Sequence, residues 1–160
     1  MLRFFLVGII SILAVTAFSQ SAKQHSTVRI NPTAVSLLEQ AKKFMKFTGE
    51  VDMPTIVSSS QHDLKQMYCP GRDCSVSAMY DSGTIYLDKD IDYNNLIDKS
   101  IILHELVHHV QWTKYGSTLD CQRWFTNERE AYKIQAKYLK SKKIDPFFIT
   151  DTVTNLKCPE

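Results

Sequence analysis

The chain has 160 residues, of which 44% are hydrophobic and 22% are charged. This length predicts one domain that is large enough to bury a core of its own. The 19 basic and 17 acidic residues nearly cancel. That balance argues against nucleic acid or an anionic membrane as the main partner, because both select strongly basic surfaces.

Residues 1–19 have the pattern of a cleavable signal peptide. Arg3 gives a positive start, an apolar run extends from Phe4 to Val15, and Ala17-Phe18-Ser19 is the small-x-small pattern that signal peptidase reads. The run is short for a bilayer span, and an uncleaved anchor is the alternative. We therefore predict a secreted or periplasmic protein with no membrane attachment after signal cleavage.

A flexible segment is expected at residues 20–31, ahead of a single domain at 32–160. Thr33 is the expected cap of the first helix, whose apolar residues recur at helical spacing before Thr48-Gly49 ends it. A strand is predicted at Thr55–Ser58.

A hairpin is predicted next. The strands Val76–Tyr80 and Thr84–Leu87 flank Asp81-Ser82-Gly83, whose residue types favour a tight turn.

Four cysteines and an export signal predict two disulfides. Cys69 and Cys74 flank a turn-forming loop, so we favour their pairing, which leaves Cys121 with Cys158. The chain has no Cys-x-x-Cys pair, so a cysteine zinc cluster is not expected.

The segment His104-Glu105-Leu106-Val107-His108 predicts a metal site. Residues four apart lie on one face of a helix, so both imidazoles can reach a single Zn²⁺ ion. Glu105 lies beside that face, within reach of a water on the metal. The flanking apolar residues recur at helical spacing, which predicts a buried amphipathic helix.

A zinc site of this kind needs a third protein ligand. Glu128 lies twenty residues after His108, near the start of a second predicted helix, and Glu130 is its rival. Two residues apart on a helix, these side chains point about 200° away from each other, so both cannot bind the same ion. A helix-start carboxylate exposed to solvent is the alternative for either one.

With this pattern of two histidines and a downstream Glu, the chain resembles the gluzincin metallopeptidases over residues 83–140. The resemblance implies Glu128 as the third ligand, and it departs at Tyr132, where the clan usually has Asp. It implies an α+β fold, a minimal zincin-like domain with a small antiparallel sheet packed on the active-site helix and the ligand helix. It also implies that an edge strand, here Gly83–Asp88, takes a peptide by strand addition.

The predicted function is therefore a zinc metallopeptidase, a monomer with one Zn²⁺ held by His104, His108 and Glu128. Glu105 is the predicted general base for a zinc-bound water that attacks a peptide or protein substrate. Two alternatives stay open: an exported zinc-binding protein without turnover, and a zinc amidase that acts on cell-wall peptides.

Three residues are candidates for stabilising the oxyanion, namely Tyr115, Tyr132 and His109, and the sequence does not rank them. Trp112 and Trp124 are expected to be packing groups rather than substrate contacts. Cleavage specificity, and the choice between endopeptidase and exopeptidase, cannot be predicted from the sequence.

Overall fold

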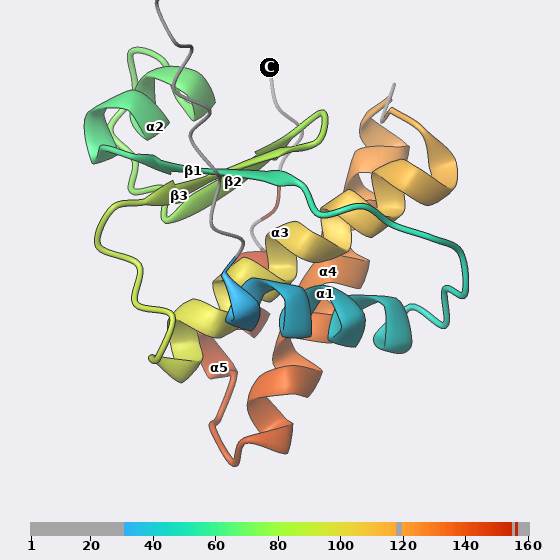
Figure 1. Cartoon of the computed structure of the whole chain (residues 1–160). Helices are drawn as coiled ribbons and strands as arrows, with labels where there is room; N and C mark the ends of the chain where they lie inside the picture. Colours follow the sequence, from blue (N-terminus) through green and yellow to red (C-terminus); the bar gives the residue numbers. More distant parts are fainter. Residues whose placement is uncertain (1–30, 118–119, 155, 157–160) are drawn as a thin grey trace, which may run out of the picture.

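The computed structural model describes residues 31–117, 120–154 and 156, and it confirms the α+β class (Figure 1). The predicted signal peptide and nearly all of the predicted flexible segment lie outside these residues. None of the described helices is long and apolar enough to cross a membrane. The described elements, in chain order, are α1 (Pro32–Phe44), β1 (Thr55–Ser59), α2 (Gln61–Tyr68), β2 (Ala78–Asp81), β3 (Thr84–Asp88), α3 (Leu96–Tyr115), α4 (Cys121–Ser141) and α5 (Phe147–Thr154).

The first helix starts slightly earlier than predicted. Its cap is Asn31 rather than Thr33, because the Asn31 side chain accepts a hydrogen bond of 2.9 Å from the backbone N–H of Thr33. Pro32 fits the first helical position, where a backbone N–H would have no partner within the helix. The helix ends at Phe44, and Lys46 then adopts a left-handed φ of 51°.

The sheet is mixed, so the predicted antiparallel sheet is only partly right. The strand order is β1-β3-β2, with β2 antiparallel and β1 parallel to β3. The predicted hairpin is confirmed, and its turn residues Ser82 and Gly83 have positive φ angles of 43° and 92°, as the tightest hairpin turns require. β1 runs parallel because α2, which was not predicted, lies between it and the hairpin and provides the crossover.

α3 is the central helix of the core. It packs against α1 and α4 and also contacts β2 and β3, and Figure 1 shows it below the sheet while α2 lies above. The predicted burial of the apolar residues of this helix is confirmed, since Leu103, Leu106, Val107 and Val110 are each 0% exposed. Burial is not confined to one face, however, because every residue from 102 to 107 is buried and the middle of the helix is enclosed on all sides. Polar groups carried there are buried too and need partners.

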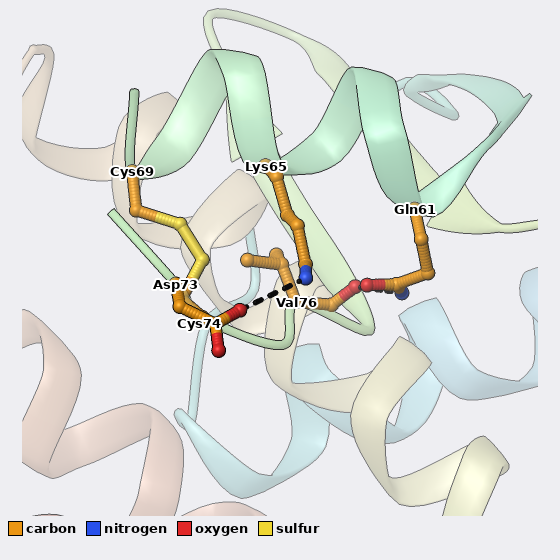
Figure 2. Close-up of a disulfide and its surroundings, with 6 residues drawn as sticks. All are labelled: Gln61, Lys65, Cys69, Asp73, Cys74 and Val76. Atoms are coloured by element: carbon orange, nitrogen blue, oxygen red, sulfur yellow. Dashed lines mark hydrogen bonds and ion pairs between the residues drawn. A yellow bond between two sulfur atoms is a disulfide. The ribbon is translucent and has the colours of Figure 1, made fainter. Parts of the chain in front are cut away.

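α2 is held at both ends against the sheet (Figure 2). At its start, the Gln61 side chain donates hydrogen bonds to the carbonyl of Val76 at 2.6 Å and to the carboxylate of Asp88. At its end, Cys69 forms the predicted disulfide with Cys74. The other predicted pairing involves Cys158, which lies outside the described residues.

Candidate metal centre

His104 and His108 lie one turn apart on α3, in a helix whose start is fixed by a cap. The Asn95 side chain accepts hydrogen bonds from the backbone N–H groups of Ile97 at 2.8 Å and Asp98 at 3.2 Å. The two imidazoles meet edge to face with their ring centroids 4.7 Å apart, and their Nε2 atoms are 3.0 Å apart. The helix repeat thus brings two nitrogen atoms together.

Glu128, from α4, completes this group. Its carboxylate oxygens lie 3.3 Å from Nε2 of His104 and 3.2 Å from Nε2 of His108. One ligand atom from each of the three residues lies within 4.8 Å of the others, and the group found among the described residues has these three members. Two imidazole nitrogens and a carboxylate oxygen form the donor set of catalytic zinc sites. The residues present therefore fit the predicted ion.

The charges in this group favour a cation. Burial raises the pKa of Glu128, but hydrogen bonds and charge from His104 and His108 outweigh it and hold the pKa well below its usual range. Burial likewise lowers the pKa of His108, but the hydrogen bond and charge of Glu128 raise it to about 9 overall. Glu128 thus keeps its negative charge, as a metal ligand must.

The rival carboxylate, Glu130, does not join the three ligands. Its Oε2 accepts a hydrogen bond of 3.0 Å from the side-chain amide of Gln111 on α3. This position agrees with the predicted divergence of side chains two residues apart on a helix. Geometry therefore favours Glu128 over Glu130 as the third ligand.

Two buried glutamines contact the far side of the histidine rings. Oε1 of Gln111 lies 2.8 Å from Nδ1 of His108, and Oε1 of Gln135 lies 3.2 Å from Nδ1 of His104. Gln111 is 2% exposed and Gln135 is 4% exposed. Each ring is therefore fixed on one side by an amide and faces Glu128 with its other nitrogen.

Glu105, the predicted base, lies beside the histidines and is only 8% exposed. Burial raises the pKa of Glu105, while the charges of His104 and His108 lower it in part. The backbone N–H of Tyr80 on β2 faces this carboxylate and also lowers its pKa in part. The backbone of β2 thus anchors this carboxylate next to the ligand group.

Of the three candidates for the oxyanion, His109 is engaged elsewhere. Its Nε2–H donates to the carbonyl of Asp52 at 2.8 Å, and its Nδ1 accepts from the Tyr80 hydroxyl at 3.2 Å. The same hydroxyl accepts from the backbone N–H of Gly83 at 2.8 Å. His109 therefore ties α3 to the β2–β3 turn, which is a structural role.

Of the two tyrosine candidates, the structure places Tyr132 at the metal centre. Its ring centroid is 4.3 Å from that of His104, whereas Tyr115 lines a different cavity beside Arg123. Tyr68, at the end of α2, was not predicted and lines the same cavity as Tyr132. Burial and the charge of Glu128 raise the pKa of both Tyr68 and Tyr132, so both keep a proton to donate.

Two cavities of about 350 Å³ each adjoin the ligand group. Both are lined by the centre itself, through His104 and Glu105, and by Ala78 of β2. Trp112 and Trp124 line the first cavity, and Trp112, which is 41% exposed, stacks on His109; that they are packing groups rather than substrate contacts stays a prediction. His104 is thus reached from both cavities, and His108 from the first.

The strand beside these cavities is β2, so the predicted edge strand is wrong. Gly83–Asp88 overlaps β3, which lies between β1 and β2 in the sheet. The Ser77 carbonyl accepts from the backbone N–H of Asp88 at 2.9 Å. In an antiparallel ladder alternate residues face the partner strand, so Ala78 and Tyr80 direct their backbone groups toward the open edge. The effect of the Tyr80 N–H on the pKa of Glu105 agrees with this orientation.

Comparison with known proteins gives one match. A family model described as "Domain of unknown function (DUF6647)" matches residues 32–159. This chain belongs to the DUF6647 family. No curated protein and no solved structure matches it. The match begins at the first residue of α1 and spans every described element, so the candidate metal centre lies inside the DUF6647 domain.

Three residues at the centre of this DUF6647 protein were not predicted from its sequence. Gln111 follows His108 by three residues, and Gln135 follows Glu128 by seven. Both spacings place the glutamine on the ligand face of its own helix, so a helical-face signal existed for each. Tyr68 gave no such signal, because its place depends on how α2 packs against the sheet.

Proposed function

We propose that this DUF6647 protein is an exported zinc-dependent peptidase. The observation that carries the proposal is the convergence of His104, His108 and Glu128 next to a buried carboxylate, Glu105, that faces the edge strand β2. A site that only stabilised the fold would need four protein ligands. It would also have no use for a buried carboxylate beside the ligands.

When bound, zinc would supply Lewis acidity that polarises a carbonyl and activates water. Glu105 takes a proton from the attacking water and delivers it to the amine nitrogen that leaves. In this step the bond between water oxygen and carbonyl carbon forms, and the carbon–nitrogen bond breaks. The hydroxyl groups of Tyr68 and Tyr132 are the available donors for the oxygen that gains negative charge.

The substrate class follows from β2. The backbone groups of Ala78 and the carbonyl of Tyr80 face the open edge and can pair with an extended chain whatever its side chains are, while the N–H of Tyr80 faces Glu105. A peptide placed there lies across the ligand group, because β2 lines both cavities. Backbone pairing suits a peptide or protein substrate, and it is compatible with a cell-wall peptide as well.

Metal content tests the ligand assignment. The mature protein is purified and its zinc measured for wild type, Glu128→Gln, Glu130→Gln and Glu105→Gln. We expect about one zinc per chain in all but Glu128→Gln, since catalytic zinc sites use three protein ligands. Absence of zinc from the wild type, or equal zinc in Glu128→Gln, would contradict the proposal.

Hydrolysis tests the activity. Wild type and Glu105→Gln are incubated with a mixture of unmodified proteins and, separately, with purified muropeptides, and new termini are identified by mass spectrometry. Removal of a general base lowers the rate by about 10²- to 10⁴-fold, so we expect cleavage by wild type alone. Cleavage of muropeptides only would favour the amidase, and bound zinc without any cleavage would favour a protein without turnover.

A further inference from the structure

The Gln111 amide has one possible orientation. Its Nε2 lies 3.0 Å from the backbone carbonyl of Asn127 and 3.0 Å from Oε2 of Glu130. Both neighbours only accept hydrogen bonds, so the amide nitrogen must be at this end. Its Oε1 therefore faces His108, and because that oxygen only accepts, Nδ1 of His108 must carry the proton.

Gln135 is oriented by the same logic through a hydroxyl. Ser100 uses its single proton to donate to the carbonyl of Ile97 at 2.6 Å. Its oxygen therefore accepts from Nε2 of Gln135 at 3.1 Å, which directs the Oε1 of Gln135 toward His104. Nδ1 of His104 must then be the donor, and Nε2, which faces Glu128, is the nitrogen left for the ion.

We propose that Gln111 and Gln135 are positioning residues that hold both histidines as Nδ1–H tautomers with Nε2 free for the ion. Glu130 acts on the centre only through Gln111. This inference rests on the proposed metal site but not on any hydrolytic activity. Both rings present Nε2 to the same point, where these two atoms are 3.0 Å apart. A partner that fixes tautomer and ring plane is what a histidine ligand requires.

The partner of each ring is an amide. Gln111 stands between the Glu130 carboxylate and His108. The Gln111 amide is satisfied at every polar position, with one acceptor for each N–H and one donor for its oxygen. Removing it takes away the hydrogen-bond partner of Nδ1 of His108.

The test measures zinc affinity by competition with a chromophoric chelator. Gln111→Leu and Gln135→Leu are each expected to weaken zinc binding by about 10- to 100-fold, as for other partners of ligand histidines. Gln122→Leu is the matched control, since Gln122 is an exposed glutamine in the first turn of α4. It is expected to bind zinc like the wild type.

Conservative variants keep the test informative if the leucine variants do not fold. Gln135→Glu retains an acceptor for His104, and Ser100 can turn its hydroxyl to donate, so zinc affinity should stay within about threefold of wild type. Gln111→Glu alone places a second carboxylate beside Glu130 and should weaken binding. The double variant Gln111→Glu/Glu130→Gln again has one carboxylate and one amide at these two positions. Its zinc affinity should therefore be about tenfold higher than that of Gln111→Glu.

Nitrogen NMR of the zinc-loaded protein, labelled with ¹⁵N-histidine, reads the tautomers directly. The expected spectrum shows Nδ1–H and coordinated Nε2 for both His104 and His108. Coordination through Nδ1 in either ring, or wild-type affinity in both leucine variants, overturns the inference. Wild type that binds zinc with these tautomers but cleaves nothing overturns the proposed peptidase and leaves this inference standing. Hydrolysis together with unchanged affinity in the leucine variants overturns the inference alone.

Discussion

Opening the Cys69–Cys74 disulfide should cost stability and activity by separate routes. The disulfide closes a loop with a sequence separation of 5. In the chain-entropy description, removing so short a closure lowers the free energy of unfolding by about 2 kcal/mol. For a domain of roughly 130 residues, the unfolding entropy converts this into a Tm about 7 °C lower.

The activity should fall because the disulfide follows directly after Tyr68. α2 contacts β2 and β3, and its last turn is tied to the segment leading into β2 by the disulfide (Figure 2). Without it the end of α2 can fray, and the Tyr68 hydroxyl is no longer held in the cavity. The three proposed metal ligands come from α3 and α4, so the zinc content is not expected to change.

The assay is urea unfolding of Cys69→Ala/Cys74→Ala, followed by circular dichroism, beside zinc analysis and peptide hydrolysis. Lys65→Ala is the control, because it removes the ion pair of 3.3 Å between Lys65 and Asp73 across the same loop. That pair is largely exposed and should contribute little. An unfolding free energy equal to wild type in the double variant would refute the entropic argument. A comparable loss in Lys65→Ala would show that contacts, not closure, stabilise the loop.

Three further predictions concern the elements that hold the centre. Leu106→Ala should lower the free energy of unfolding by about 2–5 kcal/mol, since Leu106 is 0% exposed; urea unfolding measures it, and a loss below 1 kcal/mol would contradict the packing described. Tyr80→Phe removes the hydroxyl between His109 and Gly83 and should cost about 1 kcal/mol. Faster amide exchange in the β2–β3 turn with unchanged zinc content would support this, whereas lost zinc would not. Asn95→Ala removes the cap of α3 and should cost about 1 kcal/mol, seen as a lower Tm; no change would mean that the cap is dispensable.

The parts of the centre that could be predicted from sequence are those fixed by local geometry. The spacing of His104 and His108 on one helix needs only the helical repeat, and the turn at Ser82-Gly83 needs only residues that tolerate positive φ. Glu128 required one further step, a resemblance that placed it on a return helix. The structure brings these ligands together, while zinc itself stays a prediction.

The parts that could not be predicted depend on packing between distant segments. α2 buries only Leu64 completely, and although Leu64, Met67 and Tyr68 recur at helical spacing, a helix of eight residues gives only a short pattern of this kind. Its presence decides both the parallel direction of β1 and the position of Tyr68. The central place of β3 had a weak signal, since Ile85 and Leu87 are both buried, and alternating large apolar residues suit an inner strand better than an edge.

For the two carboxylates of α4, only two roles were considered from the sequence, metal ligand and solvent-exposed side chain. Glu128 and Glu130 were treated as rival ligands, and the one that does not bind the ion was expected to be exposed to solvent. The helix does turn Glu130 away from the proposed ligand group, but α4 packs along α3, so the half-buried side chain meets Gln111. Glu130 accepts a hydrogen bond from the Gln111 amide, and the oxygen of that amide contacts His108.

A variant at Glu130 that removes its acceptor oxygens, such as Glu130→Leu, should therefore weaken zinc binding less than Gln111→Leu, because the backbone carbonyl of Asn127 still anchors the amide. Equal losses would mean that the carboxylate, rather than the Asn127 carbonyl, sets the orientation of Gln111.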